Sequence, residues 1–212
     1  MNKLSTPAAA LIIIILSVKL TLNFKPLYYY DINHLNIISN TNLKVDEIKS
    51  AYDYLIYYVT GSQKTDFNIP NLPSSKEGSI HFQEVKNIFT KLNYILYACI
   101  LIFMFGLYTA YKKKNFIFLK YSSFLSILFT ISLAIPFCIN FDSSFTIFHK
   151  IFFSNNYWIF DPALDPVINI LPEEFFFHCA ALILILIVLF SAVIFISYKF
   201  LNIKFNPSSQ GD

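Results

Sequence analysis

The chain has 212 residues, of which 56% are hydrophobic and 18% aromatic, and its mean hydropathy is +0.54. A soluble domain of this length needs far less apolar material to fill one core, so this composition excludes that class and indicates a membrane protein. The formal net charge is only +3, and the lysines are not clustered with aromatic residues, which argues against nucleic-acid binding. The sequence has no arginine, so bidentate arginine clamps are excluded from its mechanism.

Four apolar stretches are long enough to cross a bilayer, which requires about 20 mostly apolar residues per helix. They predict an all-α integral membrane protein that forms a single membrane domain over residues 1–212. The first stretch follows Lys3, but no small-residue cleavage pattern comes after it, so we interpret it as an uncleaved anchor rather than a signal peptide. The expected spans cover about residues 8–24, 88–108, 116–139 and 175–198.

The distribution of charge predicts the orientation of these spans. Lysines 112, 113, 114 and 120 crowd the short second loop, and further lysines lie outside the first and last spans. The positive-inside rule then places both termini and that loop in the cytoplasm. Segments 25–87 and 140–174 become extracytoplasmic, and they contain every acidic residue except Asp212.

The first outer segment is expected to contain a helix of its own. From Val45 onward, apolar residues recur at helical spacing until Gly61 ends the pattern, with Ile48, Ala51, Tyr52, Leu55 and Tyr58 on one face. Residues 28–32 are compatible with a short strand. The predicted fold is therefore four transmembrane helices with two outer segments, one containing this helix.

The three cysteines of the chain are predicted to have no chemical role. Their number is odd, their neighbours are apolar, and no CxxC spacing occurs, although their expected positions do not forbid a disulfide. We interpret them as small buried apolar residues.

The second outer segment contains a histidine on an aromatic helical face. At helical spacing, Phe145, Phe148, His149 and Phe152 share one side, which is typical of a helix lying in the membrane interface. Lipid ester bonds lie at the same depth, so His149 is placed to meet one. The alternative is an interfacial histidine that is merely amphipathic.

A second histidine begins the helical entry to the second span. His81 and Glu84 are one turn apart, and such a glutamate can orient or charge-stabilise an imidazole. A metal site formed by these two residues and His149 is a weaker alternative, because the ligand set is too small. His34 and His178 are expected to satisfy local polar needs.

A long motif follows His149 and carries a family resemblance. The segment from Phe148 to Phe176, FHKIFFSNNYWIFDPALDPVINILPEEFF, is similar to that of the lipoprotein intramolecular transacylase family. The helix 51–61 and the entry HFQEVK from His81 also resemble that family, so the similarity covers nearly the whole chain. Methionine and aspartate are expected at the positions of Phe82 and Glu84, and both changes keep the chemical type.

The resemblance implies acyl migration within one substrate molecule. A bacterial lipoprotein with a diacylglyceryl group on its N-terminal cysteine would have its sn-2 acyl chain moved to that cysteine's own α-amino group, leaving a lyso form. His81 and His149 match the family's catalytic histidines. The active site is expected at the extracytoplasmic face of the bacterial cell membrane, and no cofactor is expected. The residue chemistry suits this reaction, because an α-amine must lose a proton before it attacks an ester and an imidazole is a suitable base. Which histidine is the base stays open.

Further residues are expected to support the site or bind substrate. Asp161 and Asp165 each precede a proline, so the alternative is that they only form turns. The alternative for Lys86 and Lys150 is that their side chains only extend to the membrane interface. The predicted supporting residues are Glu84, Lys86, Phe148, Phe152, Trp158, Asp161, Asp165 and Glu173.

Two other functions remain open from the residues. A non-enzymatic membrane subunit that binds lipid or peptide through the aromatic residues would not need either histidine. A lipid ester hydrolase would use the same histidine pair with water and release a free fatty acid.

Overall fold

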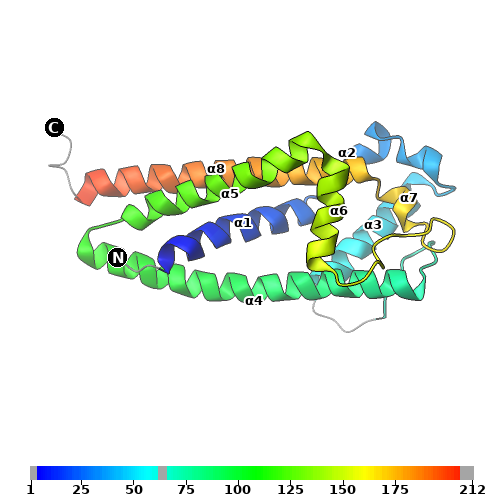
Figure 1. Ribbon diagram of the computed structural model, residues 1–212, viewed down its shortest axis with the longest axis horizontal. Helices are drawn as coiled ribbons and strands as arrows, with labels where there is room; N and C mark the ends of the chain where they lie inside the picture. Colours follow the sequence, from blue (N-terminus) through cyan, green and yellow to red (C-terminus); the bar gives the residue numbers. More distant parts are fainter. Residues whose placement is uncertain (1–3, 62–65, 206–212) are drawn as a thin grey trace. The chain divides into compact units, whose positions relative to one another are not determined.

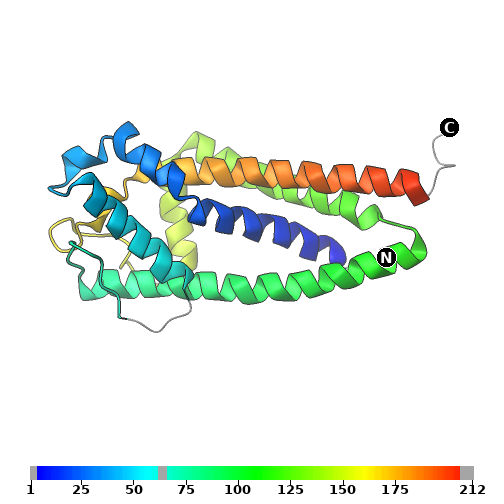
Figure 2. The ribbon, with the colours of Figure 1, turned by 180° about the vertical axis from the view of Figure 1, so that it is seen from behind.

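A computed structural model describes residues 4–61 and 66–205, and every regular element in these ranges is helical, which confirms the predicted all-α class. In chain order the elements are α1 (Ser5–Asn23), α2 (Lys25–His34), the 3-10 helix η1 (Ile37–Asn40), α3 (Val45–Thr60), α4 (Lys76–Lys113), α5 (Ile117–Ile139), α6 (Phe141–Phe152), α7 (Val167–Ile170) and α8 (Glu173–Phe205) (Figures 1 and 2).

Within the described residues, α1, α4, α5 and α8 are long and apolar enough to cross a membrane, which confirms four spans. The 38 residues of α4 extend about 57 Å and the 33 residues of α8 about 50 Å, at 1.5 Å per residue. Both exceed the ~30 Å thickness of the hydrocarbon core. Each of these two helices is therefore longer than the hydrocarbon core is thick, and the membrane boundaries along them stay predictions.

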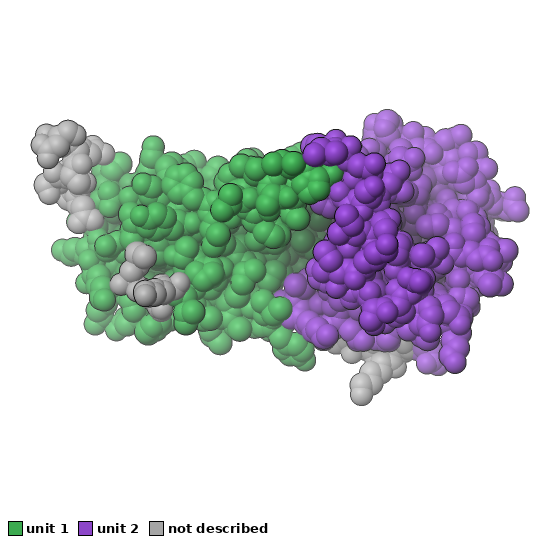
Figure 3. All heavy atoms as spheres, viewed as in Figure 1, with its two compact units in different colours: residues 1–20, 93–136, 182–212 green, residues 21–92, 137–181 purple. Residues whose placement is uncertain are grey.

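The chain divides into two compact units, which Figure 3 colours separately. Unit 1 comprises residues 1–20, 93–136 and 182–212. In this unit Gly106 of α4 faces the start of α1, where an added Cβ would collide with the Ser5 side chain. Ser122 of α5 donates a hydrogen bond to the Thr6 carbonyl oxygen at 3.1 Å. Small residues thus allow close helix packing, as is common in membrane proteins.

Unit 2 comprises residues 21–92 and 137–181, and its apolar core lies among α2, α3, α7 and the first turns of α4 and α8. Tyr28 of α2 stacks on Tyr52 of α3 with ring centroids 3.8 Å apart, and its hydroxyl donates to the Ile170 carbonyl oxygen at 2.7 Å. This bond satisfies a hydroxyl that the core would otherwise leave unpaired. Unit 2 therefore has an apolar core of its own.

The structure corrects one expected element of unit 2 and confirms another. Residues 28–32 are not a strand: they belong to α2, which begins beside Pro26 and buries Tyr28, Asp31 and Ile32 at helical spacing. The ranges 4–61 and 66–205 contain no strand. The predicted helix from Val45 is confirmed as α3, which buries every apolar position expected on its inner face.

The three cysteines are all free, as expected. Cys99 is buried and Cys179 partly buried, but Cys138 is exposed on the protein surface. The expectation of burial is therefore wrong for Cys138, which lies near the end of α5.

Candidate active site

The structure brings His81 and His149 together inside unit 2. His81 lies near the beginning of α4 and is buried, with 6% of its surface exposed, whereas His149 lies near the end of α6 and is half-buried. The centroids of the two imidazole rings are 6.1 Å apart. A small substrate group placed between them can contact both rings.

Aromatic side chains enclose the two imidazoles. Phe153 contacts both, with its ring centroid 4.7 Å from that of His81 and 5.7 Å from that of His149. Phe160 packs edge-on against His81 at 5.5 Å, and Trp158 stacks on His149 at 4.7 Å with an interplanar angle of 27°. The site therefore has mostly apolar walls, and electrostatic interactions are stronger in such surroundings than in water.

The orientation of His149 is fixed by its own helix. Asn140 caps α6 by accepting a hydrogen bond from the Ser143 amide at 2.8 Å, and His149 follows two turns later. Nδ1 of His149 lies 2.8 Å from the carbonyl oxygen of Phe145. Because a carbonyl oxygen can only accept, Nδ1 carries the hydrogen, and Nε2 of the neutral ring keeps its lone pair. Burial lowers the pKa of His149, although the hydrogen bond to Phe145 opposes part of this effect.

Glu84 has a different partner from the one expected. Its Oε1 accepts a hydrogen bond from Nδ2 of Asn155 at 2.8 Å, whereas its Oε2 is buried without a partner among the described residues. Nδ1 of His81 is likewise buried and unpartnered there. The expected contact from Glu84 to His81 is therefore replaced by one that holds the loop after α6 against α4.

Asp165 holds the beginning of α4 in place. Its carboxylate accepts hydrogen bonds from the Ser75 amide at 2.7 Å and the Ser75 hydroxyl at 2.6 Å. Ser75 Oγ in turn accepts a bond from the Gly78 amide at 2.9 Å, so it caps the helix that carries His81. Gly78 permits this clasp, because a Cβ at that position would collide with the Asp165 carboxylate.

The remaining predicted supporting residues lie at varied distances from the histidines. Lys86 is buried with its ammonium 4.3 Å from the centre of the Tyr58 ring. Phe148 contacts the His149 ring. Phe152 is 52% exposed and contacts Phe148. Asp161 accepts a hydrogen bond from the Ala163 amide at 2.9 Å and so forms a turn, which was the alternative predicted for it. Glu173 begins α8 beside Asp142.

The other two histidines form a separate group in unit 2. Nδ1 of His178 lies 2.9 Å from Oδ2 of the fully buried Asp31, and the His34 ring lies 5.9 Å from that of His178. The expectation that these histidines satisfy local polar needs is confirmed for His178, since it pairs with a carboxylate that the core encloses.

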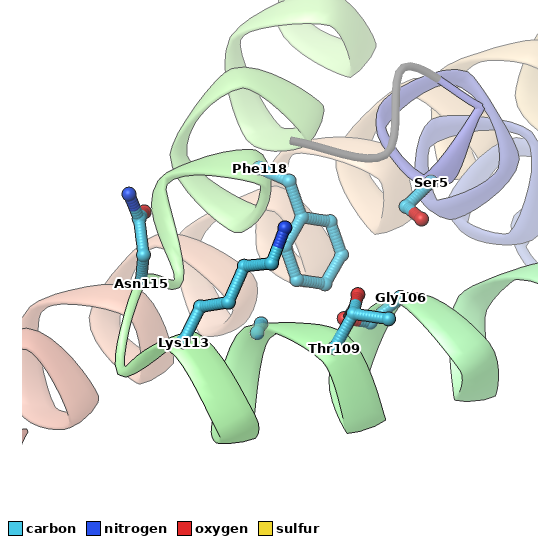
Figure 4. A pocket seen from close by; sticks show the side chains of 7 residues that line it. Ser5, Gly106, Thr109, Lys113, Asn115 and Phe118 are labelled. Atoms are coloured by element: carbon cyan, nitrogen blue, oxygen red, sulfur yellow. Dashed lines mark hydrogen bonds between the residues drawn. The ribbon is translucent and has the colours of Figure 1, made fainter.

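No group of three histidine, cysteine, aspartate or glutamate side chains suitable for a metal ion occurs in residues 4–61 and 66–205. A cavity of about 200 Å³ lies in unit 1, at the ends of α1, α4 and α5 (Figure 4). Its lining residues are Ser5, Gly106, Thr109, Ala110, Lys113, Asn115 and Phe118. Neither His81 nor His149 lines it, so this cavity is not the histidine site.

Sequence reasoning missed three side chains that shape the site. Phe153 follows His149 by four residues, so it lies on the same helical face, and this spacing is a signal that was available. Phe160 and Asn155 lie in the irregular segment after α6, where no periodicity predicts the direction of a side chain.

Taken together, four membrane-crossing helices and a histidine pair walled by aromatic rings define an integral membrane enzyme. A family model described as lipoprotein intramolecular transacylase Lit matches residues 4–176. The chain belongs to the lipoprotein intramolecular transacylase family, whose product is a lyso-form lipoprotein.

Solved structures support the same assignment. The in meso structure of the lipoprotein intramolecular transacylase Lit from Bacillus cereus is 42% identical, with a TM-score of 0.94, over 98% of this chain and 96% of that one. Two further structures of the Bacillus cereus enzyme, with one histidine changed to arginine or to alanine, are each 41% identical, with TM-scores of 0.89. They cover 98% of this chain and 93% and 94% of their own chains, respectively. No curated protein matches the sequence.

Proposed function

We propose that this enzyme acts on bacterial lipoproteins with a diacylglyceryl thioether on the N-terminal cysteine. It moves the sn-2 acyl chain to the α-amino group of the same cysteine. The amine nitrogen forms a bond to the ester carbonyl carbon, and the bond from that carbon to the sn-2 oxygen breaks. The product is an amide and a free glyceryl hydroxyl, with the sn-1 ester and the thioether retained. The observation that carries this proposal is the aromatic-walled pairing of His81 with His149 at 6.1 Å.

His149 is the general base in this proposal. Its Nδ1 is occupied by the hydrogen bond to Phe145, so Nε2 is the nitrogen that accepts a proton from the attacking amine. The lowered pKa of His149 keeps the ring neutral at pH 7, which is the form a base needs. An α-amine with a pKa near ~8 is mostly protonated at that pH, so attack starts from the fraction of substrate whose amine has already lost its extra proton to solvent. His149 then takes the second proton as the carbon–nitrogen bond forms.

His81 completes the proton transfers. Its buried ring faces His149 across the space assigned to the ester, and its Nδ1 has no partner in the described part of the chain. The departing sn-2 oxygen needs a proton, and His81 is placed to relay the one that His149 has collected. No serine, threonine or cysteine nucleophile is needed, because the substrate supplies its own amine.

The aromatic walls favour transfer over hydrolysis. Phe153, Phe160 and Trp158 surround the imidazoles with apolar surface, so the amine of the bound substrate meets little competition from water. The amine and the ester belong to one molecule, and the walls have only to fold it into an attacking geometry.

The site is proposed to lie at the extracytoplasmic interface, with both termini in the cytoplasm. The lysine distribution supports this orientation through the positive-inside rule. On α6, Ile147 and Ile151 are 57% and 71% exposed, so this helix presents uncovered apolar side chains suited to lipid. Lipoprotein and membrane lipid are thus the proposed partners, with the scissile ester at the depth of His149.

Mass spectrometry of a synthetic diacylated lipopeptide tests the reaction. The sn-2 chain is labelled with deuterium, and the purified enzyme is added in detergent or lipid. Transfer gives a product of unchanged total mass with the label on the nitrogen, because the reaction is an isomerisation. Loss of the labelled chain as free acid, with an unblocked amine, would instead establish the hydrolase alternative.

A further inference from the structure

The indole ring of Trp158 covers one face of the proposed base. It stacks on His149 with centroids 4.7 Å apart and an interplanar angle of 27°. The segment that carries it is held to α4 by the hydrogen bond from Asn155 to Glu84 at 2.8 Å. The position of the indole beside His149 is therefore built into the fold rather than left to a mobile surface side chain.

The polar atom of this indole has no partner. Nε1 of Trp158 is buried and makes no hydrogen bond to any residue in 4–61 or 66–205. An indole N–H is a donor only, and a buried donor without an acceptor is destabilising. Because folded proteins pair nearly all such groups, an exception beside a reactive histidine points to an acceptor that the substrate brings.

The proposed reaction requires a donor at this place. As the amine attacks, the ester carbonyl oxygen gains negative charge and needs a hydrogen bond. His149 cannot supply that bond while it acts as the base, since Nδ1 donates to Phe145 and Nε2 accepts the proton. We propose that the N–H of Trp158 donates a hydrogen bond to this carbonyl oxygen and stabilises the oxyanion, a role that rests on the proposed function.

The chemistry of an indole suits this role. Its N–H stays protonated through the whole reaction, so Trp158 moves no proton and only strengthens a hydrogen bond as charge develops. The proton from the amine passes through His149 and then His81 to the leaving glyceryl oxygen, and the oxyanion returns to a carbonyl in the new amide. The aromatic walls lower the local dielectric and make the bond to the charged intermediate stronger than in water.

Trp158 is the single tryptophan of the chain, which permits a test at one atom. Growth of a tryptophan-auxotrophic host on benzothienylalanine places sulfur where the N–H was and keeps the size and stacking of the ring. We expect kcat for acyl transfer to fall about 10²- to 10³-fold, the typical effect of removing one oxyanion donor. KM for the diacylated lipopeptide and the pH midpoint assigned to His149 should stay unchanged, because binding and the base are not altered.

The matched control is the enzyme grown on 5-fluorotryptophan, which changes the ring but keeps the N–H and should retain near-normal kcat. Equal activity of the sulfur and fluorine enzymes would overturn the proposal, as would equal losses in both. A lower melting temperature of the sulfur enzyme with unchanged turnover would assign the N–H to packing and also overturn it. Failure of the proposed function is a separate result, because the unsubstituted enzyme would then release labelled fatty acid instead of forming the amide.

Discussion

The carbonyl oxygen of Phe145 and Nδ1 of His149 are 2.8 Å apart, one turn along α6. This single contact determines which nitrogen of the imidazole carries hydrogen, because the carbonyl oxygen has only lone pairs to offer. It performs the orienting task that a carboxylate performs in many histidine-dependent enzymes. A neutral acceptor adds no negative charge, so it stabilises the protonated ring less than a carboxylate would, and burial still lowers the pKa of His149.

The first prediction concerns pH. A base whose pKa is lowered is neutral at pH 7 and becomes protonated only as the pH falls through that lowered value. The transfer rate should therefore fall with the protonation of two groups. The substrate amine is protonated below its pKa near ~8, and His149 is protonated only below 6.5, the ordinary histidine pKa. Single-turnover rates from about pH 4 to 9 should show the slope of log rate steepening from one to two on the acid side. A steepening centred above 6.5 would contradict the assignment of His149 as base.

The second prediction concerns the two histidines themselves. His81→Ala and His149→Ala should each lower the transfer rate about 10²- to 10⁴-fold, since each removes a general acid or base. His34→Ala is the matched control, because His34 contacts Tyr30 and His178 rather than His81 or His149. Its transfer rate should be near normal. Chain insertion and melting temperature are measured in parallel. Near-normal transfer by either of the first two variants would exclude the two-histidine mechanism.

The third prediction concerns the clasp that positions α4. In Gly78→Ala the new methyl group collides with the Asp165 carboxylate and displaces it from Ser75. The loss of these partly buried, charge-assisted bonds should cost about 1–3 kcal/mol of unfolding free energy and lower kcat, because His81 follows one turn later. Asp165→Ala breaks the same bonds, so the double variant should be no worse than either single one. Additive losses in thermal unfolding would show that the clasp is not the reason for the effect.

The sequence was sufficient for the elements that a local pattern specifies. Long apolar runs indicated the four spans, and the spacing of apolar residues from Val45 predicted α3. The strand expected at residues 28–32 is wrong, because a run of tyrosines suits a strand as well as a helix. The choice depends on contacts that the segment does not encode, namely the stacking of Tyr28 on Tyr52 and its bond to Ile170.

The site was predictable in its histidines but less so in its surroundings. His149 stood out because it lies on an aromatic helical face, and His81 because it lies one turn from Glu84 at the entry to the second span. Glu84 was assigned to His81 by spacing alone, whereas its bond is to Asn155 in a segment distant in sequence. Tertiary pairings of this kind, and the clasp between Asp165 and Ser75, have no periodic signature.

The fourth prediction concerns topology. In a background with all three cysteines replaced, Ser154→Cys should react with a membrane-impermeant maleimide in intact cells, because Ser154 is exposed in the proposed outer segment. Lys112→Cys, in the last turn of α4 at the end expected inside, should react only after the membrane is permeabilised. Labelling of Lys112→Cys but not Ser154→Cys in intact cells would reverse the proposed orientation.

The last prediction separates His178 from the catalytic pair. Its Nδ1 lies 2.9 Å from the Asp31 carboxylate, which is fully buried, whereas the His178 side chain is 29% exposed. His178→Ala should therefore destabilise the fold by leaving that carboxylate without this partner, at a cost of about 1–3 kcal/mol. The transfer rate at low temperature should stay near normal, because His178 contacts neither His81 nor His149.

In Asp31→Asn the charge is absent, so adding His178→Ala should cost less than it does in the wild-type chain. Thermal unfolding and transfer assays on these variants are compared at equal protein concentration. A large loss of transfer at an unchanged melting temperature would instead place His178 in the reaction.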